Sequence, residues 1–312
     1  MAEMTTKDIS LLYRGDQKSA IEAAELVYHE RVRAIASAVK SNSKIRIILL
    51  AGPSGSGKTT TANLIADALR ALGEESLVVS LDDFYRDATD PDYPRREDGE
   101  RDYERPEALN LPFLAETLEK VARGEAFELP RYDFKVAKRT ELKRHGPIPE
   151  GCVIIEGLHA LNPRISESLP RESVLKLFVS VSTNLNSDSE ERVISGRKIR
   201  FVRRLVRDSI YRDATAERTL DMWHHVLEAE DVYLYPYKES ADMAFDTFHT
   251  FELGVMKPYA LRLLTKELAD TDGYVRIVRT ALEGIVEVEE ALVPQNSLIR
   301  EFIPGGIYEG IY

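Results

Sequence analysis

The sequence predicts an α/β fold in which a parallel sheet is flanked by helices on both faces. Short, mostly apolar runs alternate with segments of helical periodicity, an order typical of βαβ units. The runs span residues 45–50, 76–81, 152–155 and 175–181. Strands that are buried on both faces of a parallel sheet have this near-continuous apolar character. A glycine-rich turn follows the first run, and carboxylates follow the second and third, so polar groups gather at the carboxyl edge of the predicted sheet.

The glycine-rich turn is the most specific motif of the chain. It reads GPSGSGKT over residues 52–59, the full G-x-x-x-x-G-K-[ST] pattern, and apolar residues at helical spacing follow it up to residue 72. Glycines let the backbone curl with its N–H groups turned inward, and a helix N-terminus adds positive potential. The sequence therefore predicts a P-loop NTPase-type fold that binds a nucleoside triphosphate. The residues assigned to the nucleotide are Gly52, Pro53, Ser54, Gly55, Ser56, Gly57, Lys58, Thr59 and Thr60.

Composition argues against several classes of protein. The 312 residues carry a formal net charge of −11, whereas a general nucleic-acid binder normally presents a basic face. No apolar run has the length needed to cross a bilayer, and the first residues lack the apolar core of a signal peptide. The single cysteine, Cys152, can form no internal disulfide, as is usual in a reducing compartment. We therefore expect a cytoplasmic protein that binds a small molecule rather than nucleic acid or a membrane.

Acidic residues extend the predicted site beyond the turn. Asp82 and Asp83 follow the second strand, and Glu156 follows the third. Because the carboxyl ends of parallel strands meet at one edge, these side chains should converge with Thr59. In such a site Lys58 reaches the β- and γ-phosphates and the Thr59 hydroxyl ligates Mg²⁺. Glu156 would hold Mg²⁺ or its water, and Asp82 would accept a proton from a substrate hydroxyl. Glu156 could instead cap the next helix, and Asp82 and Asp83 could instead cap a turn. The residues alone separate Asp82 from Asp83 poorly.

Basic residues cluster between positions 197 and 212 of this otherwise acidic chain. Some of them recur at helical spacing on one face: Arg200, Arg203, Arg204 and Arg207. A solvated charge stripe would give this pattern, but the phosphate loop upstream favours an arginine lid, at about residues 197–215, over a transferring phosphate. Arg204, Arg207 and Arg212 are the residues expected to neutralise its charge.

Aromatic side chains supply candidates for a second binding pocket. The run YDFKVAKR, over residues 132–139, mixes aromatic and basic side chains in a hairpin-like pattern. Together with Tyr85 and Tyr103 it could stack on and orient a ring-shaped substrate. Core packing explains any single one of these aromatics equally well.

Taken in order from about residue 45 to residue 248, the motifs resemble the uridine kinase and phosphoribulokinase-like group of P-loop kinases. The matching stretches are SLDDFYR (80–86), YERPEA (103–108), PRYDF (130–134), EGLH (156–159) and RRLVRD (203–208). The resemblance implies that Asp82 is the general base, that Glu104 holds ribose hydroxyls, and that PRYDF belongs to an extra substrate-binding hairpin. The chain is similar in particular to a bacterial uridine kinase-like branch, which SLIREFI at residues 297–303 also fits.

Departures from the family pattern leave the acceptor open. Uridine–cytidine kinases carry a base-reading histidine three residues after YDF, where this chain has Ala137. Their lid continues R-G-R-D, whereas residues 211–214 read YRDA, so one arginine is missing. A site that hydrogen-bonds its substrate discriminates chiefly through such polar contacts. The expected acceptor is a nucleoside, uridine or cytidine by default, and the alternative is a sugar, a sugar phosphate or another small hydroxyl compound.

The resemblance thus implies a kinase that uses ATP and Mg²⁺ and phosphorylates a hydroxyl group, the 5′-hydroxyl in the case of a nucleoside. The signatures of other nucleotide-binding proteins, N-K-x-D of guanine-specific switches and L-S-G-G-Q of transporter ATPases, do not occur in the sequence. The predicted parts are a helical extension (1–43), a P-loop kinase domain (44–269) and a C-terminal extension (270–312). Assembly into a homo-oligomer is an expectation from the family alone.

The site residues divide by predicted role. The catalytic residues are Lys58, Asp82, Arg207 and Arg212, and the metal ligands are Thr59 and Glu156. Arg204 is assigned to both the nucleotide and the acceptor. The acceptor site is completed by Asp82, Tyr85, Tyr103, Glu104, Tyr132, Phe134 and Arg139.

Overall fold

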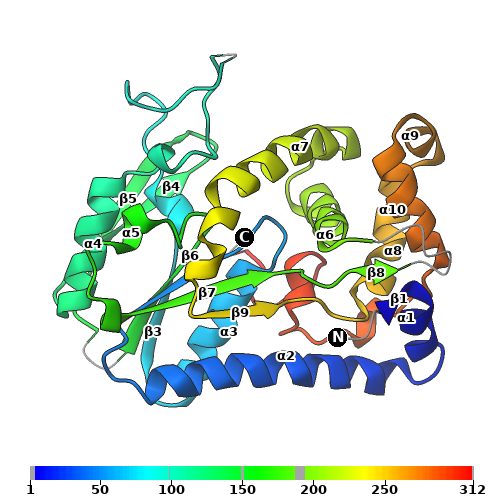
Figure 1. The fold of residues 1–312 in the computed structure, drawn as a ribbon, viewed down its shortest axis with the longest axis horizontal. Coiled ribbons are helices and arrows are strands. Elements are labelled where there is room, and N and C mark those ends of the chain that lie inside the picture. Colours follow the sequence, from blue (N-terminus) through cyan, green and yellow to red (C-terminus); the bar gives the residue numbers. More distant parts are fainter. Residues whose placement is uncertain (1–3, 98, 149–150, 187–193, 311–312) are drawn as a thin grey trace.

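A five-stranded parallel sheet lies at the centre of the computed structural model, which describes residues 4–97, 99–148, 151–186 and 194–310 (Figure 1). The strand order is β3-β6-β2-β7-β9, and all neighbouring pairs are parallel. The strands span Ile47–Ala51 (β2), Glu75–Ser80 (β3), Gly151–Glu156 (β6), Val174–Ser180 (β7) and Met243–Asp246 (β9). The predicted α/β class is confirmed. Strand β9 was not predicted, because its four residues, MAFD, are too few to show a period.

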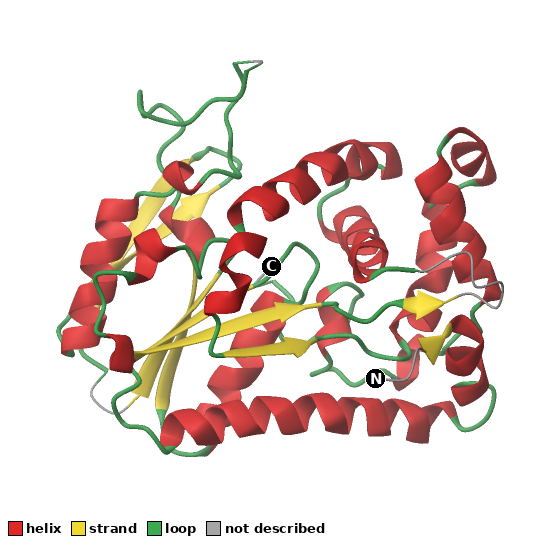
Figure 2. Cartoon of the chain, viewed as in Figure 1, coloured by secondary structure: helices red, strands yellow, loops and turns green. Residues whose placement is uncertain are grey.

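Helices cover both faces of this sheet (Figure 2). They span Thr6–Leu12 (α1), Gln17–Lys40 (α2), Lys58–Ala71 (α3), Leu111–Arg123 (α4), Pro163–Ser166 (α5), Gly196–Tyr211 (α6), Ala216–Tyr233 (α7), Glu252–Leu263 (α8), Lys266–Thr271 (α9) and Gly273–Gly284 (α10). Residues 252–271 form two helices rather than one. Thr265 caps the start of α9 by accepting from the backbone N–H of Leu268 (3.2 Å), which separates α9 from α8. The predicted C-terminal extension contains α10.

The two faces of the sheet bury two different hydrophobic cores. In β2, Ile48 and Leu50 belong to one core, whereas Ile47, Leu49 and Ala51 belong to the other. This division follows from the two-residue period of a strand. The first core contains residues of α2, α3, α6, α8 and α10, and the second contains residues of α4. The phosphate loop directly follows β2, a strand whose five residues are all buried.

Both terminal segments pack into the first core. Figure 1 shows α2, in blue, lying along the lower edge of the molecule beside α3. At the other end of the chain, Leu298, Ile299, Phe302 and Ile303 are fully buried in the same core. The segments predicted as extensions thus share a core with the central part of the chain, and the boundaries near residues 44 and 269 stay predictions.

A β-hairpin stands apart from the main sheet. Its strands, β4 (Phe127–Asp133) and β5 (Lys138–His145), pair in antiparallel fashion, as the pattern of residues 132–139 suggested. Ala137 lies in the turn of this hairpin with a φ of 51°. Two further strands, β1 (Met4–Thr5) and β8 (Leu185–Asn186), form a short parallel pair. Within the described part of the chain, every helix is too short or too polar to cross a membrane.

The variant Phe302→Ala should lower the free energy of unfolding by about 3–5 kcal/mol. Its ring is fully buried, and the guanidinium carbon of Arg203 lies 5.1 Å from the ring centroid. Equilibrium unfolding in urea measures the change. The matched control in the same tail is Ile307→Ala, whose side chain is 54% exposed and whose loss should cost no more than about 0.5 kcal/mol. Equal effects of the two variants would contradict the placement of the tail in the core.

Candidate active site

The phosphate loop connects β2 to α3 and depends on two glycines. Gly55 and Gly57 have φ angles of 72° and 82°, in the left-handed region that glycine adopts at least cost. A Cβ atom at Gly55 would lie 2.8 Å from the carbonyl oxygen of Arg200. At Gly57 it would lie 2.6 Å from the side chain of Leu298. Conformation and close packing therefore both exclude a side chain at these positions.

The carbonyl groups of the loop from Pro53 to Gly57 all accept hydrogen bonds from side chains. The pairs are Lys58 Nζ to Pro53 O (3.2 Å), Arg200 Nη1 to Ser54 O (2.8 Å), Arg203 Nη1 to Gly55 O (3.1 Å), Thr247 Oγ1 to Ser56 O (2.8 Å) and Thr61 Oγ1 to Gly57 O (2.6 Å). Pairing the carbonyl groups in this way turns them away from the inside of the loop, where N–H groups can form an anion-binding nest.

Several N–H groups of the loop have no acceptor among the described residues. They are those of Gly55, Gly57, Lys58 and Thr59. Buried backbone N–H groups are rarely left unpaired, so these groups call for a ligand. They lie at the N-terminus of α3, where Gly57 provides no capping side chain. An anion such as a phosphate is the ligand that a helix N-terminus favours.

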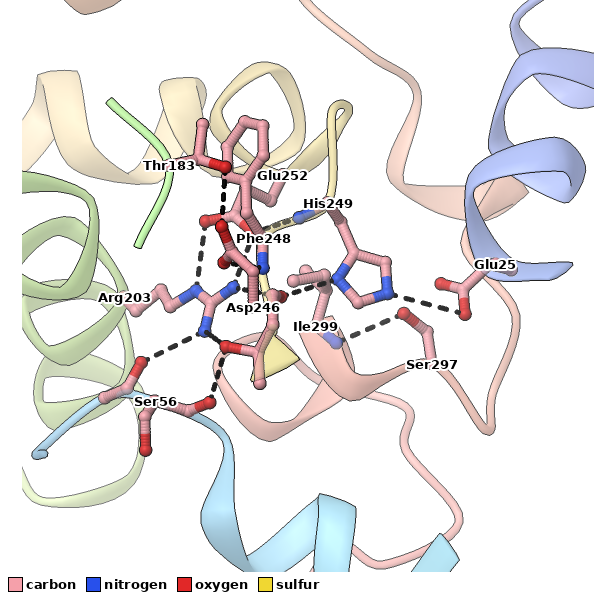
Figure 3. Close-up of polar contacts among 12 residues, drawn as sticks. Glu25, Ser56, Thr183, Arg203, Asp246, Phe248, His249, Glu252, Ser297 and Ile299 are labelled. Carbon is pink, nitrogen blue, oxygen red and sulfur yellow. Dashed lines mark hydrogen bonds and ion pairs between the residues drawn. The ribbon is translucent and has the colours of Figure 1, made fainter. Parts of the chain in front are cut away.

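Two buried arginines of α6 support the phosphate loop by donating hydrogen bonds to its carbonyl groups. Arg203, which is fully buried, forms two bonds to Glu252 of α8 (2.6 Å and 3.0 Å), and Figure 3 shows it between this carboxylate and Ser56 of the loop. Arg200 is 1% exposed and forms two bonds of 2.8 Å to Glu230 of α7. Both arginines therefore support the loop, and the prediction that they belong to a lid over the transferring phosphate is wrong.

Three further arginines of the cluster share one carboxylate. Arg207 donates to Asp208 Oδ1 through two nitrogens (2.9 Å and 2.8 Å), Arg204 Nε lies 3.2 Å from Oδ2, and Arg212 Nη1 lies 3.5 Å from Oδ1. Repulsion by Arg207, together with burial, lowers the pKa of Arg212 to about 10. Arg204 Nη1 also donates to the hydroxyl of Ser54 in the loop (2.9 Å). This cluster carries excess positive charge beside the phosphate loop, and it contains the three arginines expected to neutralise the transferring phosphate.

Asp82, Glu156 and Lys58 form an electrostatically coupled group. Burial raises the pKa of Glu156 to about 7 and raises the pKa of Asp82, and the Lys58 ammonium opposes both shifts. Arg212 also acts on Asp82. Asp82 keeps access to solvent although the surrounding protein raises its pKa, whereas Glu156 is 5% exposed. The structure thus brings together the predicted base, metal ligand and phosphate-binding lysine.

The structure gives Asp82 and Asp83 different surroundings. Asp83 Oδ1 accepts a hydrogen bond from the backbone N–H of Tyr132 (3.2 Å), and Asp83 Oδ2 lies 3.8 Å from Arg131. Asp83 therefore anchors the hairpin, while Asp82 faces Lys58.

The oxygen atoms near the loop fit Mg²⁺. Among the described residues, no group of three or more His, Cys, Asp or Glu side chains could hold a metal ion on its own. Mg²⁺ usually needs only one or two protein oxygens, because phosphates and water complete its shell. The Thr59 hydroxyl has no hydrogen-bond partner in the described structure, and Glu156 is a buried carboxylate that a cation would stabilise in its ionised form.

The aromatic residues predicted for the acceptor lie together. The ring of Tyr85 is 5.9 Å from that of Tyr103, 5.7 Å from that of Tyr132 and 5.5 Å from that of Phe134. The Tyr85 hydroxyl donates to the carbonyl of Tyr103 (2.8 Å). Tyr93 joins this group, with its ring 5.6 Å from that of Tyr103. Sequence reasoning missed Tyr93, because the polar loop around it shows no periodicity.

Glu104 lies near the reacting groups, and Arg139 does not. Burial raises the pKa of Glu104 to about 6, with Arg204 opposing the shift and Asp82 adding to it. The guanidinium of Arg139 instead lies 5.9 Å from the ring centroid of Phe113 on α4. It lines a pocket of about 280 Å³ whose walls include Tyr85 but neither Asp82, Glu104 nor any residue of the phosphate loop. The structure therefore separates Arg139 from most of the predicted site.

Comparisons with known proteins agree with this geometry. The sequence model of the "Phosphoribulokinase / Uridine kinase family" matches residues 47–253. The chain is similar to a uridine kinase of Lactobacillus johnsonii, with 29% identity over 198 residues that cover 63% of this chain and 84% of that protein. A uridine kinase of Deinococcus deserti is 29% identical over 198 residues, covering 63% of this chain and 85% of that protein.

Among solved structures, a possible uridine kinase from Bacillus stearothermophilus aligns with a TM-score of 0.45 and 18% identity, over 70% of this chain and 98% of that one. The family match covers the strands of the central sheet, the phosphate loop and the arginine cluster. The chain belongs to the phosphoribulokinase/uridine kinase family of P-loop kinases.

Proposed function

We propose that the protein transfers the γ-phosphoryl group of ATP to a hydroxyl group of a small molecule, by default the 5′-hydroxyl of a nucleoside such as uridine or cytidine. The observation that carries this proposal is the set of unpaired N–H groups at the N-terminus of α3, beside Lys58 and the arginines on Asp208. Phosphoryl transfer depends chiefly on positioning and on positive charge around the phosphates, and the site supplies both.

The reaction assigns one role to each group of side chains. The carboxylate of Asp82 accepts the proton of the acceptor hydroxyl, whose oxygen forms a bond to the γ-phosphorus. The bond from that phosphorus to the bridging oxygen breaks, and ADP leaves. Arg204, Arg207 and Arg212 neutralise the charge on the transferring group. When bound, Mg²⁺ neutralises charge on the phosphates, and Thr59 and Glu156 are the residues that would hold it.

Charge around the aromatic group favours an uncharged acceptor. Glu104 and Asp82 would repel a second phosphate, and two basic residues of the hairpin are placed elsewhere. Arg131 lies 3.8 Å from Asp83, and Arg139 lines a different pocket. The clustered rings favour a ring-shaped substrate with hydroxyl groups. Because Ala137 offers no polar side chain to a base, an unphosphorylated sugar or another small hydroxyl compound is the alternative acceptor.

The test is ADP release from Mg·ATP across a panel of ribonucleosides, deoxynucleosides, pentoses and sugar phosphates. The control is Lys58→Ala, which removes the charge that binds the β- and γ-phosphates. Stimulation by uridine or cytidine that is lost in the control supports the nucleoside proposal. Stimulation by a sugar alone supports the alternative, and an enzyme that no hydroxyl compound stimulates contradicts the proposed class of acceptor.

The variant Asp82→Asn should lower kcat by at least about a hundredfold, the usual contribution of a general base. Steady-state kinetics with the best acceptor measure this loss. The matched control is Asp83→Asn, which keeps an oxygen to accept from the Tyr132 N–H and should retain most of the turnover. The base assignment is wrong if both variants lose turnover equally or if Asp82→Asn turns over normally.

The value of kcat/KM, measured with the acceptor as the varied substrate, should fall as the pH drops through about 6. The reason is that kcat/KM depends on ionisations of the free enzyme, and the pKa of Glu104 is raised to about 6. Above that pH the carboxylate is ionised and can accept from two hydroxyls, and below it protonation removes part of this capacity. Glu104→Gln should lower kcat/KM and abolish the inflection, which pH profiles of the two enzymes reveal. Glu97→Gln in the same loop should keep the inflection, and an unchanged profile in Glu104→Gln would rule out this role.

A further inference from the structure

The C-terminal segment 297–303 contacts the phosphate loop although it lies outside the family match, which ends at residue 253. It contains the 3₁₀ turn Leu298–Glu301. Leu298 packs so closely on Gly57 that a Cβ atom there would lie 2.6 Å from its side chain. Arg300, the residue before Glu301, holds this turn in place by donating to the carbonyls of Glu290 (2.9 Å) and Val293 (2.7 Å).

Glu301 makes the most specific contact of this segment. Its Oε2 atom accepts from the backbone N–H of Thr60 (3.1 Å) and from the Thr60 hydroxyl (2.9 Å). Both residues are buried, Glu301 at 5% exposure and Thr60 at 0%. Thr60 stands in the first turn of α3, where N–H groups have no acceptor within the helix and where acidic side chains are favoured. Glu301 thus supplies the cap that Gly57 cannot provide.

This contact does not occupy the two N–H groups that precede Thr60. The N–H groups of Lys58 and Thr59 directly precede Thr60 and have no acceptor among the described residues. Thr60 was predicted to contact the nucleotide, but both of its donors are directed to Glu301. A carboxylate that competed with phosphate for the cradle would take these free N–H groups instead.

We propose that Glu301 is a positioning residue for nucleotide binding, an inference that rests on the proposed use of ATP. By holding Thr60, it fixes the first turn of α3, and with it the N–H groups of Lys58 and Thr59, in the geometry that receives phosphates. Glu301 acts through Thr60 and does not touch the reacting atoms. The C-terminal segment therefore contributes to the binding of phosphates by the loop.

The test measures the Kd of Mg·ATP by isothermal titration calorimetry, together with KM and kcat. Glu301→Ala should raise the Kd for Mg·ATP at least about tenfold, because two hydrogen bonds to a charged acceptor are lost. kcat at saturating ATP should change much less. Glu301→Gln keeps an oxygen that can accept one of these bonds and should restore most of the affinity. Glu287→Gln, a change at an exposed residue of the same tail, should bind Mg·ATP as the unaltered protein does.

The possible outcomes separate this inference from the proposed function. If the unaltered protein does not bind Mg·ATP, the proposed function fails. If it binds Mg·ATP and Glu301→Ala binds equally well, the positioning role alone is wrong. Tighter binding by Glu301→Ala would mean that the carboxylate competes with phosphate, which also overturns the inference. If Glu301→Ala does not fold, the Kd of Mg·ATP for Thr60→Val tests the inference instead. Loss of the Thr60 hydroxyl donor should still weaken Mg·ATP binding several-fold.

Discussion

The phosphate loop can present its N–H groups to an anion only if its carbonyl groups find donors elsewhere. Five consecutive carbonyls, from Pro53 to Gly57, meet this requirement through side chains of α3, α6 and the residue that follows β9. The positions of α6 and β9 are therefore tied to the loop. Two of the donors are buried arginines, and a buried arginine is tolerated only when a carboxylate neutralises it. Glu230 and Glu252 provide that charge from α7 and α8.

Charge is arranged differently on the two sides of the loop. On one side, Arg200 and Arg203 each pair with a carboxylate of their own, so their positive charges are neutralised. Beside the loop, Arg204, Arg207 and Arg212 share the single carboxylate of Asp208, so this side stays positive. The acceptor side holds Asp82 and Glu104, whose pKa values are raised by burial. This distribution of charge suits a polyanionic phosphate donor together with an uncharged acceptor.

Sequence reasoning succeeded where the signal was local. The motif of residues 52–59 and the apolar strands each carry their information within a short window, and the structure agrees with them. It failed where the partner is distant in the chain. Helical spacing placed Arg203 and Arg204 together on one face, but their roles differ because only Arg203 meets Glu252, 49 residues away. The contact of Glu301 with Thr60 spans 241 residues and leaves no local signature.

The most direct test of this account is a crystal structure with a non-hydrolysable ATP analogue and Mg²⁺. The account predicts that the β- and γ-phosphates accept hydrogen bonds from the free N–H groups of residues 55–59 and that Lys58 Nζ leaves the Pro53 carbonyl to bind them. Arg200 and Arg203 should keep their present carbonyl partners. Phosphates bound away from α3, or a loop whose carbonyls leave these arginines when the nucleotide binds, would contradict it.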